Sequence, residues 1–173
     1  MIYSQDTAAD LRVGLGSTAK NGCGWIAAYN TFLLMNDFMA PEVIIIKLKS
    51  VWFGLRLFGL WGIRSHSLVK LFKSKGYTVK RKLFPRKNRV SFDDAVQTSR
   101  VLILEYIWRN PSRRFWNGGV GGHYVAIRYV PEDPEGNYYI YAEGSGDTEP
   151  RRLFSVDDWV RKQRAVVSVT EVS

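Results

Sequence analysis

Apolar residues in the first half of the chain recur at helical spacing. Residues 23–34 are apolar on nearly every side, which predicts a buried central helix that begins at Cys23. A second segment, 41–48, starts at a proline and reads as a helix by its flanks, although its β-branched content would also suit a strand. A third helix is predicted around 68–72, with a cap at Ser65 or Ser67 and Gly76 after its end.

The second half of the chain alternates between apolar and polar positions, which is typical of strands. The predicted strands are 77–83, 101–107, 123–130, 138–143 and 165–169. The turn-rich residues 131–136 predict an antiparallel hairpin, and Ser91 and Ser155 predict the caps of two short helices. Helices followed by antiparallel strands indicate an α+β fold, in which a central N-terminal helix packs against a C-terminal antiparallel sheet.

Composition is that of one globular domain over residues 1–173, because 19.8 kDa with 46% hydrophobic residues can bury a sizeable core. A single cysteine excludes an internal disulfide. The first twenty residues contain no apolar run of the kind found in signal peptides, and the apolar window 51–63 is interrupted by Arg56 and is too short to cross a bilayer. We therefore expect a cytoplasmic protein without a membrane span.

Positive charge is concentrated in one block of the chain. Residues 43–92 carry 13 Lys/Arg and no acid, whereas the remaining residues carry 12 Lys/Arg and 16 Asp/Glu. Such a block is commonly a solvated face, and its alternative is a contact surface for an acidic partner. Tryptophan and phenylalanine residues lie between these basic residues, so a basic polyanion-binding module is a competing interpretation, although nucleic acid is not the favoured partner.

Two residues have the chemistry of a catalytic pair. Cys23 lies between Gly22 and Gly24 at a predicted helix start, where unpaired N–H groups and the helix dipole favour a thiolate, and the glycines would let a substrate chain approach the sulfur. A lone cysteine is more often a small buried apolar residue, but His123 follows it at the predicted start of a strand. One cysteine and two histidines at this spacing match no zinc pattern, and no metal or organic cofactor is expected.

The segments NGCGWIAAYN at 21–30 and GGHYVAI at 121–127 resemble those of papain-like cysteine peptidases, above all the bacteriocin-leader (double-glycine) peptidase-like branch. The resemblance implies a papain-like fold, in which Cys23 attacks a peptide or protein substrate and His123 is the general base and acid. It also implies an orienting residue on the strand beside the histidine. The hairpin register suggests Glu143 for this role, with Asp147 as the runner-up.

The resemblance further implies an oxyanion-hole glutamine six residues before the cysteine, a position that Ser17 occupies here. Asn21, through its side chain, and Cys23, through its backbone N–H, are the other candidates. The sequence therefore predicts a thiol-dependent hydrolase that cleaves a peptide or amide bond through an acyl-enzyme on Cys23. The alternatives are a cysteine acyltransferase on the same fold, or an inactive papain-like or polyanion-binding domain.

Overall fold

The computed structural model describes residues 1–8, 10–50, 55, 62–86, 89–109, 120–144, 146–162 and 165–173. The helices are the 3-10 helix η1 Gln5–Ala8, α1 Thr18–Asn21, α2 Cys23–Leu34, α3 Pro41–Ser50, α4 Ser65–Lys73, α5 Phe92–Thr98 and α6 Val156–Arg161. The strands are β1 Arg12–Val13, β2 Gly16–Ser17, β3 Val79–Leu83, β4 Val101–Arg109, β5 Val120–Tyr129, β6 Tyr138–Tyr141, β7 Arg151–Leu153 and β8 Ala165–Val172.

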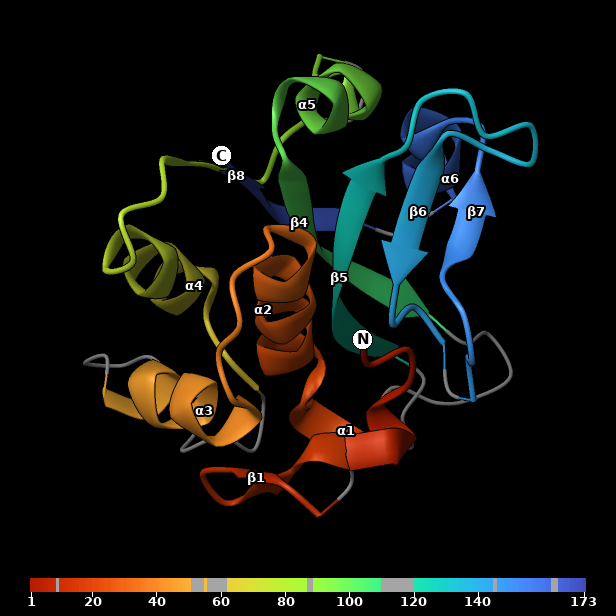
Figure 1. The fold of residues 1–173 in the computed structure, drawn as a ribbon. Helices are drawn as coiled ribbons and strands as arrows, with labels where there is room; N and C mark the ends of the chain where they lie inside the picture. Colours follow the sequence, from red (N-terminus) through yellow and green to blue (C-terminus); the bar gives the residue numbers. More distant parts are fainter. Residues whose placement is uncertain are drawn as a thin grey trace.

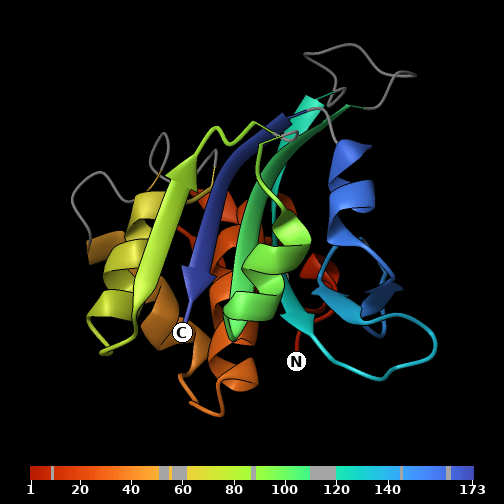
Figure 2. The same cartoon turned by 90° about the horizontal axis from the view of Figure 1, so that it is seen from above.

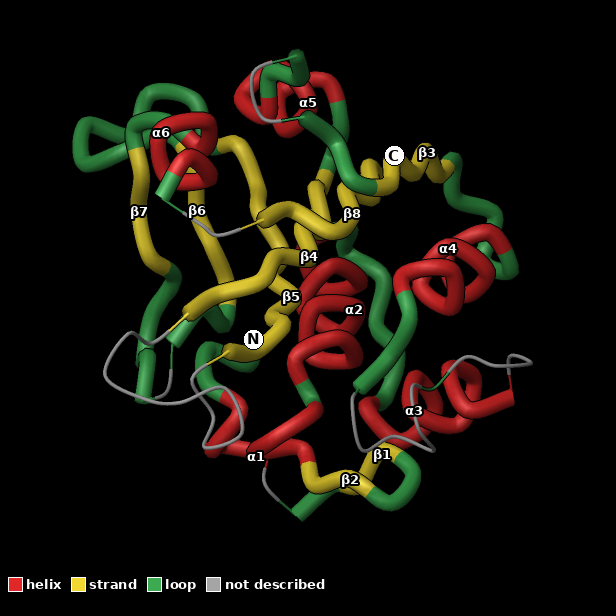
Figure 3. Tube along the Cα trace, turned by 180° about the vertical axis from the view of Figure 1, so that it is seen from behind, coloured by secondary structure: helices red, strands yellow, loops and turns green. Residues whose placement is uncertain are grey.

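Six strands form one antiparallel sheet in the order β3-β8-β4-β5-β6-β7 (Figure 2). Helices α2, α3 and α4 cover one face of this sheet, and α5 and α6 cover the other (Figures 1 and 3). The α+β class predicted from the sequence is confirmed. The sequence predicted helices on one face of the sheet only. In the structure, strand residues alternate between two apolar clusters, and each cluster has its own helices.

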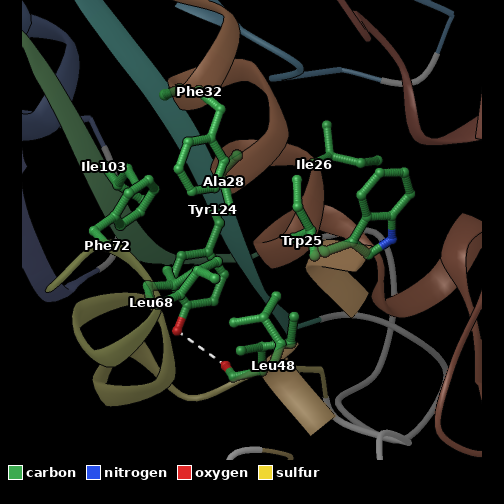
Figure 4. Close-up of a cluster of buried hydrophobic side chains, with 14 of the residues drawn as sticks. Trp25, Ile26, Ala28, Phe32, Leu48, Leu68, Phe72, Ile103 and Tyr124 are labelled. Atoms are coloured by element: carbon green, nitrogen blue, oxygen red, sulfur yellow. Dashed lines mark hydrogen bonds between the residues drawn. The ribbon is translucent and has the colours of Figure 1, made fainter. Parts of the chain in front are cut away.

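Helix α2 is the central buried helix that its apolar sequence predicts. It begins at Cys23, and ten of its twelve residues are buried. Trp25, Ile26 and Phe32 are each 0% exposed (Figure 4), and burial of a side chain of this size contributes about 1.5–3 kcal/mol. The rings of Phe32 and Phe72 pack with their centroids 4.9 Å apart, which ties α2 to α4. The first turn of α2 is therefore held rigidly by the core behind it.

The predicted capping serines are confirmed. Ser91 and Ser155 each accept a hydrogen bond from the N–H of the third residue of their helix, at 3.1 and 3.2 Å. The two short helices also cap each other, because Asp93 accepts from the first N–H of α6 at 2.6 Å and Asp157 from the first N–H of α5 at 2.8 Å. Carboxylates at helix N-termini are favoured there by the helix dipole, so α5 and α6 stabilise each other on the second face of the sheet.

Several boundaries differ from the expected ones. The segment 41–50 is a helix, as its flanking residues predict, and not a strand. Strands β5 and β6 form the predicted antiparallel hairpin with Ala126 opposite Tyr141. Strand β5 begins at Val120, so His123 lies within the strand and not at its start. Strand β7 was not predicted. Most of the window 51–63, and residues 110–119 before β5, lie outside the described residues. None of the described helices is long and apolar enough to cross a membrane.

Candidate active site

The glycines on either side of Cys23 are required by packing. A Cβ on Gly22 would come within 2.4 Å of the side chain of Thr18, because the chain turns tightly between α1 and α2 there. A Cβ on Gly24 would lie 3.2 Å from Ile63, on the core side of the helix. Packing therefore gives both glycines a steric reason, and close approach of a substrate chain stays a prediction. Cys23 itself is 7% exposed, so only part of the thiol is accessible.

His123 is held by a backbone carbonyl. Its Nε2 lies 2.7 Å from the carbonyl oxygen of Ala142, and the side chain is 8% exposed. A carbonyl oxygen can only accept a hydrogen bond, so Nε2 must carry a proton. In the neutral ring this leaves Nδ1 with a lone pair, and Nδ1 is the nitrogen that can take a proton from a thiol.

The structure brings Cys23 and His123 into hydrogen-bond contact, as the resemblance implies. Burial lowers the pKa of His123, but the hydrogen bond with Cys23, the charge of Cys23, the Ala142 carbonyl and the charge of Glu143 raise it. The net effect is a pKa above the usual 6.5 for histidine. The surroundings of the ring therefore favour the protonated imidazole.

The group that orients His123 is not the expected Glu143 side chain. Strand β6 ends at Tyr141, and Ala142 adopts a left-handed φ of 60°, which is uncommon for a residue with a Cβ. The carboxylate of Glu143 instead accepts hydrogen bonds from Nε1 of Trp159 at 3.0 Å and from Arg151 at 2.8 Å. The sequence prediction missed this arrangement because the hairpin register was extended past the point where pairing stops.

The runner-up, Asp147, makes no hydrogen bond to the ring among those found in the described part of the chain. Its carboxylate accepts from the backbone N–H of Gly144 at 2.7 Å, which shapes the turn after β6. Asp147 therefore bonds the turn after β6 and not the imidazole ring.

Aromatic rings connect His123 to Glu143. The ring of Tyr106 meets that of His123 edge to face at 5.7 Å, and it meets Trp159 in the same way at 5.2 Å. Burial, followed by the charges of Glu143 and Cys23, raises the pKa of the Tyr106 phenol, which stays protonated at neutral pH. The Glu143 carboxylate thus supports the imidazole through Trp159 and Tyr106, besides acting on it through its charge.

A cleft of about 1080 Å³ opens beside His123. It is lined by Gln5, Ala19 and Lys20 on one side, by Tyr106, Trp108, Gly122 and His123 from β4 and β5, and by Glu135 and residues of the 143–152 segment on the other side. This volume exceeds that of a small-molecule site, and it leaves room for several residues of an extended peptide.

The predicted oxyanion residues Ser17 and Asn21 are not among the described residues that line this cleft. Ser17 is the N-cap of α1 and pairs with Arg12 in the small β1–β2 ribbon, and Asn21 is the last residue of α1. Cys23 is not among these lining residues either, and its backbone N–H, at the first position of α2, stays a predicted donor.

Sequence reasoning missed one residue that touches the site, Gln5. Its side-chain amide lies 3.4 Å from Nδ1 of His123, although 118 positions separate the two residues. A signal existed, because Gln5 is the sole glutamine that precedes Cys23 in the sequence. The resemblance implied a glutamine only at the position six residues before Cys23, whereas the contact of Gln5 with His123 depends on the tertiary path of the chain.

The comparisons do not place the chain in a known family: no protein-family model matches it, and no curated protein matches it. Within the described ranges, no group of three or more His, Cys, Asp or Glu side chains is placed to hold a metal ion.

Proposed function

We propose that this protein is a cysteine peptidase-like hydrolase that cleaves a peptide or amide bond through an acyl-enzyme on Cys23. The observation that carries the proposal is the pairing of Cys23 with a His123 ring whose Nε2 is fixed by Ala142, so that Nδ1 is the nitrogen left for the thiol. A nucleophile, a base and a group that orients the base are the parts that acyl transfer requires. The cysteine on a helix and the histidine on a sheet also agree with the papain-like arrangement that the sequence motifs suggest.

The chemistry has two stages. The Cys23 thiolate attacks the substrate carbonyl carbon, a C–S bond forms, the C–N bond breaks, and the amine leaves with the proton from Nδ1 of His123. Water then gives a proton to Nδ1 and attacks the thioester, so that a C–O bond forms and the C–S bond breaks. The acid product leaves, and the thiolate is regenerated beside the imidazolium.

The start of α2 supplies the stabilisation of the oxyanion. The N–H groups of the first helical turn have no acceptor within the helix, and the dipole adds positive potential at the same end. A preorganised donor at this position is commonly worth about 3 kcal/mol in the transition state. The rigid packing of Trp25 and Ile26 keeps these donors in place.

The proposal is tested with a small acyl donor, p-nitrophenyl acetate, which suits a thiol that is 7% exposed. We expect a burst of p-nitrophenol and an acetyl group on Cys23 in the mass spectrum, with slow turnover afterwards. His123→Gln should lose the burst while it keeps the thermal unfolding transition of the parent. Acetylation at lysines alone, or an equal burst in both proteins, would contradict the proposal. Added amines that intercept the acyl group would assign the enzyme to acyl transfer instead of hydrolysis.

A further inference from the structure

Residues 2–4 contact three segments that surround the site. The backbone of Ile2 makes two hydrogen bonds with the side chain of Asn30, at 2.9 and 2.7 Å, and Asn30 is 0% exposed within α2. Tyr3 stacks on Tyr141 of β6 at 6.3 Å. Ser4 accepts a hydrogen bond from the N–H of Gly146 at 3.0 Å. The N-terminal segment therefore lies between α2 and the hairpin side of the site (Figures 1 and 3).

These contacts bring Gln5 to the imidazole in one orientation. On one side of its amide lie the carbonyl oxygens of Thr18 and Ala19, which accept from the amide nitrogen at 2.9 and 3.2 Å when that nitrogen faces them. The reverse orientation would place the amide oxygen against two other oxygens, which is electrostatically unfavourable. The amide oxygen therefore faces Nδ1 of His123, where the amide lies 3.4 Å away.

An oxygen in this position distinguishes between the two states of the ring. It can share the Nδ1–H of the imidazolium with the sulfur of Cys23, and it faces a lone pair when the ring is neutral. We propose that Gln5 is a positioning residue that favours the imidazolium form of His123 and thereby sustains the ion pair with Cys23. This role rests on the proposed thiol chemistry, since it is the thiolate partner of the ion pair that would use it.

The groups that surround the His123 ring have opposing effects on its protonation. On α2 it faces Cys23, on β4 Tyr106, and after β6 Glu143, whose charge raises the pKa of His123. Other charged residues that line the cleft are Lys20 on α1, Glu135, Asp147, Glu149, Arg151 and Arg152. Arg151 pairs with Glu143 and Arg152 with Glu135, which offsets part of the field at His123. Gln5 adds a neutral, directional contribution that salt does not screen.

Gln5 does not serve as an oxyanion donor in this arrangement. Both N–H groups of its amide are used by the carbonyl oxygens of Thr18 and Ala19. A donor to the substrate would have to leave these two acceptors unpaired. The effect of Gln5 is therefore expected in the substrate-free protein, before any carbonyl compound binds.

The experiment compares Gln5→Met with the parent and with Gln97→Met, which makes the same change at a glutamine that bonds Tyr138, far from the ring. NMR titration of the His123 ring should show a midpoint lower by about half to one pH unit in Gln5→Met, and none of this shift in Gln97→Met. Alkylation of Cys23 by iodoacetamide at pH 6 should slow about three- to tenfold, because less of the ion pair is present.

Gln5→Asn is a second variant, whose amide is one methylene too short to span Thr18, Ala19 and His123. It should shift the titration in the same direction, so a poorly folded Gln5→Met protein would not leave the question open. An unchanged His123 midpoint in both variants would overturn the role of Gln5. Loss of ester turnover without a change in titration would show that Gln5 acts on the substrate. A parent Cys23 that reacts no faster than a free thiol would instead contradict the proposed function, while the His123 titration still reports on Gln5.

Discussion

Two regions of the six-stranded sheet differ in how their polar groups are held. Beside β5, Cys23 and His123 are over 90% covered, and a backbone carbonyl fixes one ring nitrogen. At the opposite edge, β3 exposes Lys80, Arg81 and Lys82, and of these only Lys82 has an ion pair, with Glu171 at 3.5 Å, among those found in the described part of the chain. Buried contacts thus determine the geometry for chemistry, whereas exposed charges are free to meet a partner.

The β3 edge also presents backbone groups to solvent. The N–H groups of Thr78 and Phe84 donate to β8, so strand alternation turns those of Val79, Arg81 and Leu83 away from the sheet. Charged side chains commonly protect such an edge from pairing with other chains. Since exposed ion pairs contribute little to stability, changes there should leave the site intact.

The largest expected effect comes from the buried pair Cys23 and His123. Cys23→Ala should abolish ester turnover, with a loss of at least about 10³-fold, because the proposed acyl-enzyme forms on its sulfur. The variant removes one sulfur atom from a small space, so its thermal unfolding should stay close to that of the parent. Steady-state kinetics with p-nitrophenyl acetate measures the effect. Turnover within tenfold of the parent would place the nucleophile elsewhere.

Glu143→Gln should have a smaller effect. Its carboxylate acts on His123 through charge and through Trp159 and Tyr106, and not through a hydrogen bond to the ring. We expect kcat to fall about tenfold or less, with Asp147→Asn as the control at the neighbouring turn. A loss above about 10³-fold would restore Glu143 as the residue that directly orients the imidazole.

The protonation of His123 can be compared between the parent and Cys23→Ala. Its pKa is raised in the folded protein, so the resulting stability is present below about pH 6.5 and is lost as the pH rises through the folded-state pKa. Cys23→Ala removes the main cause of the increase and leaves burial dominant. NMR titration should therefore show a midpoint above 6.5 in the parent and a lower midpoint in the variant. Equal midpoints would show that the two side chains do not interact.

The smallest effect on chemistry is expected at β3. Replacement of Lys80, Arg81 and Lys82 by glutamine should weaken the salt-dependent binding of an acidic peptide several-fold and leave ester turnover within about twofold. Binding measured by fluorescence anisotropy at two salt concentrations checks the first part. If a folded variant lost ester turnover, the conclusion that the β3 edge is independent of the Cys23–His123 site would be wrong.

Local patterns were sufficient to predict α2, the capping serines and the β5–β6 hairpin, because each depends on neighbouring residues. The juxtaposition of Cys23 and His123 was also foreseen from their order on a helix and a strand. The carbonyl of Ala142 could not be foreseen, since any residue supplies a carbonyl and its direction depends on a left-handed φ. Gln5 was missed because its contact with His123 arises from the tertiary path of the N-terminal segment.

The central claim, that Cys23 and His123 act as one unit, is tested most directly by alkylation with iodoacetamide. The rate at pH 6 should be at least about tenfold higher in the parent than in His123→Gln, and peptide mapping should place the label on Cys23. Thermal unfolding of both proteins shows that the difference does not come from loss of the fold. The same rate in both folded proteins would contradict the account.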